Sequence, residues 1–385
     1  MAGVFSDKPL AATELTAADC NIHLVQARDS ILRMQQVLAE LSRRCDQIGA
    51  MDDLKYFLSR PGALKKTPCL LLFSSNSRIP TENTPPDELM GALLLYEYRV
   101  AGRSSRIFAT EDTTGRRTLV APPAIRSTVA MMASRTLLDR GAESILISFR
   151  HPDPTVDLSL AKSLTGAAAS RWASREREIV GYLPLESTLD ETLAKMGRRT
   201  RNHLRYYRRR AEAQLGCRLC PQVDISRSEF LALNRECAYA VPDAVAGWRY
   251  DSYKDLAAPL LIGIIDKDGR WLSVAGGRRH NGRMEVHWQM NRNDLPLLSL
   301  STIMRTYLIE HEISQGTERL YFEGGTKHSM NHSFVTEKAT DLIVMRRSPI
   351  ALLMRKLAKR LLPPEHMLLQ VLSDKDLHWH LVGKR

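Results

Sequence analysis

The sequence lacks a long apolar run, a secretory leader and a dense set of cysteines. No stretch approaches the roughly 18 to 20 uninterrupted apolar residues of a membrane-spanning helix, and no basic segment followed by an apolar one opens the chain. Six cysteines in 385 residues are too few for a secreted disulfide scaffold. We therefore expect a cytoplasmic protein with reduced thiols.

The sequence also lacks a complete metal-binding motif. Cys217 and Cys220 have CxxC spacing, but no second pair or His-rich partner follows at zinc-finger spacing. His328 and His332 stand four residues apart, again without a third ligand at motif spacing. We expect no bound metal.

Composition predicts a folded, basic protein of two domains. The length of 385 residues exceeds what one core usually supports, and 44% hydrophobic with 25% charged residues is typical of globular chains. A formal net charge of +12 indicates an anionic partner, which charge alone does not identify. Nucleic acid, an anionic membrane face and a phosphate-bearing substrate or cofactor all satisfy it.

The two halves of the chain repeat one order of elements: strand, hairpin, helix, strand. After a helical segment at 12–47, the first half predicts strands at 69–74, 89–100, 106–110 and 144–149, with a helix between Pro123 and Gly141. The second half predicts strands at 260–265, 271–279 and 284–290, a helix at 297–314 and a strand at 319–323. Asp-Gly and Asn-Gly turns, at 268–269 and 281–282, make its three-stranded meander the clearest element.

A strongly basic helix separates the halves. The capping box of Thr188 and Glu191 opens it and Gly216 closes it. One arc of this helix carries arginines, and the neighbouring arc is a packing stripe of Leu, Tyr and Ala. The arginine arc consists of Arg198, Arg201, Arg205, Arg208 and Arg209.

This order resembles the GNAT acyltransferase fold. The segments Lys195–Gly216 and Tyr321–Phe334, with the meander between them, are similar to the FemA/FemB-like and CelD-like branch, whose proteins carry two GNAT-like domains in tandem. The resemblance implies an α/β protein with mixed, mainly antiparallel sheets flanked by helices. We expect an N-terminal helical extension at 1–54, GNAT-like domains at 55–165 and 185–350, and a C-terminal amphipathic helical extension at 351–385.

The resemblance implies a phosphate site at the N-terminus of the helix after the meander, where backbone N–H groups bind the pyrophosphate of acyl-CoA. Ser299 and Ser301 are the candidates there, although 291–302 lacks the family's glycine-bearing segment and carries Asp294. In the first domain, Gly115, Arg116 and Arg117 precede the corresponding helix and are the alternative donor site. Plain strand-to-helix loops would have the same sequences.

The last strand of the meander predicts a polar face. Arg283, Glu285, His287 and Gln289 alternate with Met284, Val286, Trp288 and Met290. Glu285 and His287 are candidate general bases for an attacking amine, and Gln289 is a candidate substrate ligand. A hairpin with one solvated face would show the same alternation.

Glu323 ends an apolar strand directly before two glycines, at the strand end where α/β sheets bind ligands. It is the third catalytic candidate. By resemblance, Lys327 and Asn331, together with His328 and His332, line the substrate cleft, and Arg201 and Arg205 contribute charge to an anionic substrate. A polar loop is the alternative for 327–332.

The expected function is transfer of an acyl group from acyl-CoA, most simply acetyl-CoA, to an amine of a polar or anionic acceptor such as a small molecule, a glycan precursor or a peptide. No cofactor is expected to stay bound. Aminoacyl transfer from a charged tRNA, as in Fem-type proteins, is the alternative enzyme. A non-catalytic nucleic-acid or membrane-surface binding protein on a degenerate GNAT scaffold is the third class, since an apolar stripe opposite Lys and Arg in 350–361 would suit an anionic membrane surface.

Overall fold

The chain divides into two compact units. The structure, a computed structural model, describes residues 20–45, 51–64, 66–100, 102–110, 118–150, 170–280, 282–322, 329–347, 356, 360 and 379–382. Unit 1 consists of Met1–Leu58, Gly62–Arg177 and Lys338–Arg385, and unit 2 of Ser59–Pro61 and Glu178–Glu337. No helix in these described ranges is long and apolar enough to cross a membrane.

This division differs from the expected domain boundaries. The segment 21–45, expected in an extension, belongs to unit 1, and 338–347, expected in the second domain, also returns to unit 1. The expected amphipathic helix at 351–385 lies almost wholly outside the described residues.

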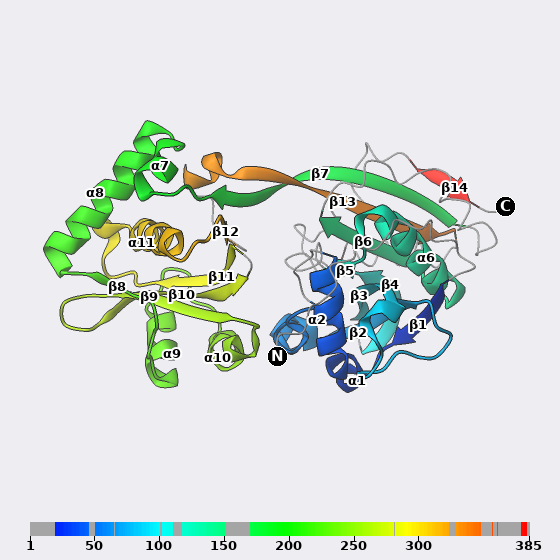
Figure 1. Cartoon of the computed structure of the whole chain (residues 1–385). Helices are drawn as coiled ribbons and strands as arrows, with labels where there is room; N and C mark the ends of the chain where they lie inside the picture. Colours follow the sequence, from blue (N-terminus) through cyan, green and yellow to red (C-terminus); the bar gives the residue numbers. More distant parts are fainter. Residues whose placement is uncertain are drawn as a thin grey trace, which may run out of the picture. The chain divides into compact units, whose positions relative to one another are not determined.

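Unit 1 is built on a mixed sheet with the strand order β1-β2-β3-β4-β6-β13 (Figure 1). Neighbouring strands are antiparallel except β4 and β6, which are parallel. Its strands are β1 (Asn21–Val25), β2 (Thr67–Ser74), β3 (Leu89–Val100), β4 (Arg103–Ala109), β5 (Leu119–Val120), β6 (Ser144–Arg150), β13 (Val335–Arg346) and β14 (His380–Val382). Its helices are α1 (Arg28–Arg33), α2 (Gln35–Arg44), α3 (Leu54–Ser59), α4 (Pro61–Leu64) and α6 (Arg126–Asp139).

Both faces of the unit 1 sheet are buried. Cys69, Leu71 and Phe73 pack with α6 on one face, while Leu70 and Leu72 pack with α1, α2 and α3 on the other. A strand buried on both faces is apolar at every position, which is why Cys69–Ser74 is a continuous apolar run in the sequence.

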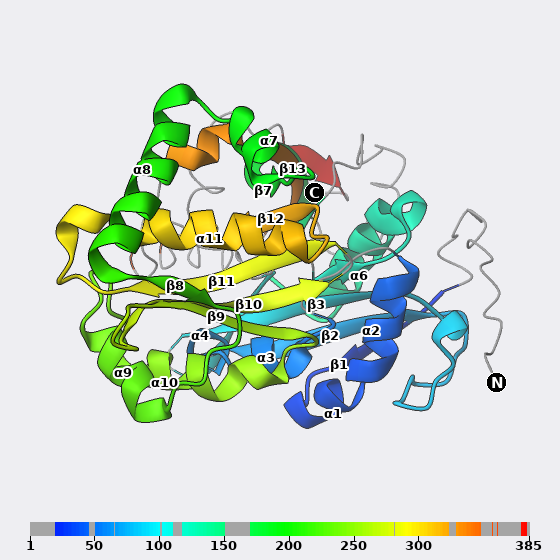
Figure 2. The ribbon, with the colours of Figure 1, turned by 60° about the vertical axis from the view of Figure 1, so that its left-hand side comes forward.

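Unit 2 repeats this arrangement around the strand order β7-β12-β11-β10-β9-β8. Its strands are the C-terminal half of β7 (Ser170–Pro184, of which the residues from Glu178 belong to unit 2), β8 (Arg218–Cys220), β9 (Pro259–Ile265), β10 (Trp271–His280), β11 (Arg283–Asn291) and β12 (Arg319–Phe322). Its helices are α7 (Leu189–Ala194), α8 (Arg198–Leu215), α9 (Arg227–Arg235), α10 (Asp243–Ser252) and α11 (Leu300–Ser314). Helices α8 and α11 cover one face of the sheet and α9 and α10 the other (Figure 2).

The two units share one topology. In each, three antiparallel strands are followed by a helix and by a strand parallel to the third: β2-β3-β4, α6 and β6 in unit 1, and β9-β10-β11, α11 and β12 in unit 2. In each unit, the strand that pairs with the fourth strand is not the next strand in the sequence. β7 follows β6 in sequence but pairs with β12, and β13 follows β12 but pairs with β6.

Two expected elements are corrected by the structure. Residues 21–25 form an edge strand, not part of a helix, because they pair with the apolar β2. The capping box at Thr188 caps the short helix α7, and α8 begins separately after Gly197. Gly216 ends α8 in the left-handed conformation, at φ 57°, as the sequence predicts.

Candidate functional site

A β-bulge at His287 shapes the centre of unit 2. Gly276 pairs with Trp288 and Gly277 with Val286, which leaves His287 as the extra residue on β11. A Cβ atom on Gly277 would lie 1.8 Å from the carbonyl oxygen of Glu285. One on Gly276 would lie 2.1 Å from the Trp288 ring. The Gly-Gly pair therefore permits the close approach of the two strands at the bulge.

After the bulge, each side chain of β11 lies on the face opposite to the one that strict alternation predicts. Met284 and Val286 pack in the cluster that contains α11, whereas Trp288 and Met290 pack with α9 and α10. The expectation that Arg283, Glu285, His287 and Gln289 share one face is therefore wrong, because strict alternation ends at the extra residue. Gln289 lies on the α11 side and Glu285 on the opposite side.

Glu285 and His287 lie in a buried ionic cluster. Arg278 Nε donates to Glu285 Oε2 at 2.9 Å, and these two side chains are 3% and 4% exposed. His287 Nε2 lies 3.6 Å from the same oxygen, with the side chain 4% exposed. The two candidate bases are thus close together, but in a closed environment beneath α9 and α10. Their role as general bases remains a prediction.

Strands β11 and β12 pair in parallel from Arg283–Arg319 to Val286–Phe322, where the described part of β12 ends. β11 continues past the bulge to Asn291, and η5 (Pro296–Leu298) then leads into α11. The C-terminal end of β11 is thus followed within a few residues by the N-terminus of a helix.

A cavity of about 180 Å³ lies at this end of β11 and α11. It brings together three residues that the sequence predicts for the site: Gln289, Ser299 and Ser301. The cavity is also lined by residues that the sequence did not predict for the site: Cys237, Ala238, Tyr239, Met290, Asn291, Arg292, Leu295, Pro296 and Leu300. The 237–239 segment reaches the cavity because Cys237 forms a β-bridge with Arg292.

Ser299 has an unusual backbone conformation at the N-terminal end of α11. It is the N-cap of α11 with φ 44° and ψ 60°, a left-handed conformation that a non-glycine residue adopts rarely. Its carbonyl accepts from Thr302 N at 2.8 Å, and its hydroxyl lies 2.8 Å from that of Thr302. Backbone strain of this kind concentrates at functional sites, so the observation supports this helix end as the binding region.

Asp294, the acidic residue in this region, is paired with arginines. Asp294 accepts from Arg292 at 3.1 Å and lies 3.3 Å from Arg270, and the hydrogen bond with Arg292 is the main reason that the pKa of Asp294 is lowered. Arg210 of α8 donates to the carbonyl oxygen of Leu297, just before α11, at 3.4 Å. Because two arginines balance its charge, Asp294 repels a phosphate at the start of α11 less than an unpaired carboxylate would.

The arginines of α8 have different surroundings. Arg205 forms an ion pair with Asp190 at 2.6 Å, and Arg201 donates to the carbonyl oxygen of Ala194 at 3.1 Å, so both bind back to α7. Arg208 lies over the Tyr307 ring and pairs with Glu212 and Glu310, each at 2.8 Å. Arg208 consequently joins α8 to α11, unlike the exposed Arg198, Arg199 and Arg209.

The other candidates are incompletely covered by the structure. Asn331 lies half-buried in η6 (Ser329–Ser333), where its carbonyl accepts from Phe334 N at 3.1 Å. The remaining candidates lie outside the described residues: Glu323, Lys327, His328, Gly115, Arg116 and Arg117.

Arg305 of α11 is a charged residue that the sequence analysis missed. It is 3% exposed, and its Nε and Nη1 atoms find no hydrogen-bond partner among the described residues. Its guanidinium carbon lies 4.6 Å from the centre of the Phe322 ring. Burial lowers the pKa of Arg305 to about 10. An arginine inside the mostly apolar run Ile303–Ile309 was the available signal.

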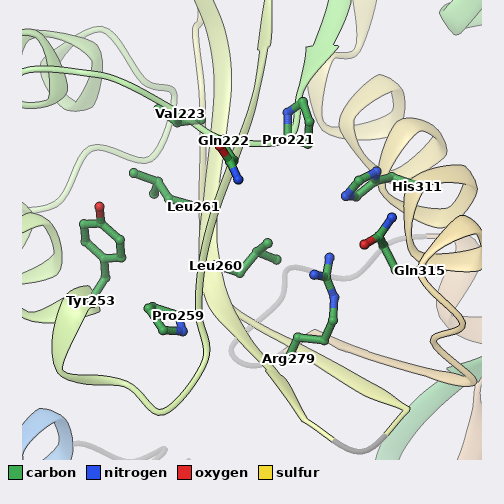
Figure 3. Close-up of a pocket in the computed structure, with 10 residues that line it drawn as sticks. All are labelled: Pro221, Gln222, Val223, Tyr253, Pro259, Leu260, Leu261, Arg279, His311 and Gln315. Atoms are coloured by element: carbon green, nitrogen blue, oxygen red, sulfur yellow. The ribbon is translucent and has the colours of Figure 1, made fainter.

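A larger cavity, of about 570 Å³, lies at the opposite end of α11 (Figure 3). His311 and Gln315 project into it from α11, on the same side as Arg279, while Tyr253, Pro259 and Leu261 form an apolar wall. Both oxygens of the buried Glu312 accept from Arg279, at 2.6 and 3.0 Å, and burial lowers the pKa of His311. No residue predicted for the site lies here.

The described cysteines do not form a reactive centre. All six are free thiols, and burial raises the pKa of Cys237, beside the smaller cavity, to about 11. Cys217 is buried and Cys220 half-buried. Among the residues described, no group of three or more His, Cys, Asp or Glu side chains is placed to hold a metal ion.

Comparison with known proteins identifies the fold. No protein-family model matches the chain, and no curated protein matches its sequence. The crystal structure of FemX has 9% sequence identity and a TM-score of 0.54, covering 85% of this chain and 98% of FemX. A conserved protein of unknown function from Bacteroides thetaiotaomicron has 9% identity and a TM-score of 0.51, covering 84% and 100%. The chain therefore has the α/β fold of FemX, with GNAT-like units in tandem.

Proposed function

We propose that this protein is an N-acyltransferase that moves an acyl group from acyl-CoA to an amine of a polar or anionic acceptor. The observation that carries the proposal is the cavity of about 180 Å³ between the C-terminal end of β11 and the N-terminus of α11. The FemX-like fold supports the proposal at the level of architecture.

The donor site is proposed at the start of α11. The N-terminus of a 15-residue helix carries a partial positive charge, and its first N–H groups point away from the helix toward a ligand. Ser299 and Ser301 add hydroxyl groups, and Arg210 adds a cation nearby. These groups fit the diphosphate of CoA, which would leave the pantetheine arm to enter the cavity beside the end of β11.

In the proposed reaction the acceptor amine attacks the thioester carbonyl, the C–N bond forms, and the CoA thiolate leaves. The amine must lose one proton, and a base within hydrogen-bond reach, directly or through one water, would take it. Glu285 and His287 remain the proposed bases. Since Glu285 already binds Arg278, His287 is the one whose replacement gives the clearer result.

A negative charge placed at the start of α11 tests the donor site. Ser301→Asp should weaken acetyl-CoA binding by about tenfold or more, equivalent to about 1.4 kcal/mol, because the carboxylate repels the diphosphate. The helix itself should tolerate Asp in its first turn. Isothermal titration measures the affinity.

Ser228→Asp is the matched control, since Ser228 is exposed in the first turn of α9 and makes the same charge change. Equal weakening by both variants, or by neither, would contradict a diphosphate site at α11.

Aminoacyl transfer from a charged tRNA is the second candidate, favoured by the exposed arginines of α8. Arg198, Arg199 and Arg209 are exposed, and Tyr206 is 50% exposed between them. Arginines that bind phosphates beside an aromatic ring suit a nucleic acid. Tight binding of labelled tRNA that falls steeply with salt, without saturable acetyl-CoA binding, would favour this candidate over acyl-CoA transfer.

A further inference from the structure

The cavity of about 570 Å³ at the C-terminal end of α11 has the size of a small-molecule site. Pockets for small ligands usually measure roughly 300–1,000 Å³ and combine apolar walls with a few polar groups. All residues that line this cavity are described, and all belong to unit 2. The start of α11 is about 20 Å away along the helix axis, since the helix has 15 residues at 1.5 Å each. The cavity is therefore separate from the proposed donor site.

The polar side of the cavity presents hydrogen-bond donors. Arg279 uses Nε and Nη2 to bind the fully buried Glu312, which leaves the two N–H groups of Nη1 outside that ion pair. Figure 3 shows the guanidinium pointing into the cavity, toward His311 and Gln315. Among the described residues that line the cavity, none is Asp or Glu. This set of groups suits an oxygen anion.

The opposite side is apolar and lies beside the part of β9 that β8 leaves uncovered. In the described chain, β8 pairs with β9 only at 263–265, whereas the wall consists of Tyr253, Pro259 and Leu261. Pro259 has no N–H group, and the Leu261 carbonyl already accepts from Val223 N at 3.2 Å. A peptide that adds to the sheet as a strand would find few backbone partners here, so the cavity suits a small molecule instead.

The helix end beside the cavity is compatible with a bound anion. A helix C-terminus carries partial negative charge on its last carbonyl groups. In α11 the carbonyl oxygens of 311–313 each accept from a backbone N–H of 315–317, at 2.9 to 3.1 Å. Burial lowers the pKa of His311, so its ring is neutral at pH 7 and donates from one nitrogen. Arg279 supplies the cation.

We propose that this cavity binds a small carboxylic acid, whose carboxylate accepts from Arg279 Nη1 and His311 and whose apolar body packs on Tyr253 and Leu261. Arginine suits a carboxylate because its planar donors match the two oxygens and its charge persists at every physiological pH. The cavity is a second ligand site of the protein, and it does not depend on the acyltransferase function proposed above.

The test measures the melting temperature of the full chain at pH 7 in hexanoate, acetate or hexanamide, each against sodium chloride at equal ionic strength. Hexanoate at about 50 mM should raise the melting temperature by about 1–3 °C, as expected for a ligand that binds only the folded state. Acetate lacks the apolar body and hexanamide lacks the charge, so each should give less than half of this rise. An equal rise with hexanamide, or no rise with hexanoate, would overturn the proposal.

Charge at Gln315 locates the binding site, because this exposed side chain projects into the cavity. Gln315→Glu should abolish the rise with hexanoate, and Gln315→Lys should increase it. Each rise is measured against the same variant in chloride, so differences in the variants' own stability do not enter.

Gln214→Glu and Gln214→Lys are the matched controls, since Gln214 is exposed in the last turn of α8 and makes the same charge changes. Both should keep the wild-type rise. A wild-type rise in Gln315→Glu, or equal effects at positions 214 and 315, would show that hexanoate does not bind in this cavity.

Discussion

At the scale of single residues, Glu285 combines the proposed role of a base with a structural role. Its carboxylate is 3–4% exposed and balances the equally buried Arg278. Removing one partner of a buried ion pair leaves the other charge uncompensated in a medium of low polarity. Any loss of activity on changing Glu285 must therefore be separated from a loss of folded protein.

We expect Glu285→Gln to lower the free energy of unfolding by about 3 kcal/mol, because Arg278 remains buried without its counter-charge. Urea denaturation followed by circular dichroism measures the change. The double variant Arg278→Met/Glu285→Met should lose less than Glu285→Gln, since it removes both charges. A loss below about 1 kcal/mol, typical of an exposed pair, would mean that water reaches the cluster.

A separate prediction for His287 concerns the rate of the reaction. If it takes the proton of the attacking amine, His287→Ala should lower kcat by roughly 10²- to 10⁴-fold with little change in acetyl-CoA affinity. Gln214→Ala, on the exposed side of α8, is the control. Turnover within a few fold of wild type for both His287→Ala and Glu285→Gln would place the base elsewhere.

At the scale of elements, the bulge in β11 depends on its partner strand. Gly277→Ala would put a Cβ atom 1.8 Å from the Glu285 carbonyl oxygen, so the strands must move apart. We expect a loss of about 4 kcal/mol in unfolding free energy, at the severe end for single substitutions. Gly197→Ala is the control, because nothing lies within 4 Å of the added atom. Thermal denaturation that ranks the two variants equally would contradict this account of the bulge.

The same bulge marks the limit of prediction from sequence. The meander was predictable because its turns carry Asp-Gly and Asn-Gly and its strands are apolar. The unbroken alternation of 283–290 hid the extra residue, since the bulge is decided by packing against Gly276 and Gly277. Strand β7 was missed because charged residues in 171–178 resemble a solvated segment. Gln289, Ser299 and Ser301 line one cavity, although their roles stay predictions. The burial of Arg305 was missed because its local signal, one arginine within a mostly apolar stretch of helix, is weak.

At the scale of the whole molecule, the sheet of unit 1 includes β13, a strand that comes after all of unit 2 in the sequence. Strand β13 pairs with β6 from Ala339–Arg150 to Met345–Ser144, and its buried Asp341 accepts from Ser148 at 2.5 Å and from Arg175 at 3.0 Å. We expect a chain that stops after Glu337 to lose amide-exchange protection in β6 almost completely, while β10 of unit 2 stays protected. Hydrogen exchange with mass spectrometry measures both strands in one sample.

A chain that stops after Arg347 is the control, because it keeps all of β13. It should retain protection in β6. Full protection of β6 in the shorter chain would contradict the assignment of 338–346 to unit 1.

The exchanged strands also fix an order of completion on the ribosome. Unit 1 is begun first but finished last, because the 160 residues of 178–337 are synthesised before 338–346 can reach β6. At typical synthesis rates of about 5–20 residues per second, this wait lasts roughly 10 to 30 s. Throughout it, β6 has an open edge with the apolar Ile145 and Ile147, the kind of edge that pairs with other chains. The nascent protein therefore depends on protection of this edge, by chaperones or by slow, dilute expression, more than the stability of its finished fold would suggest.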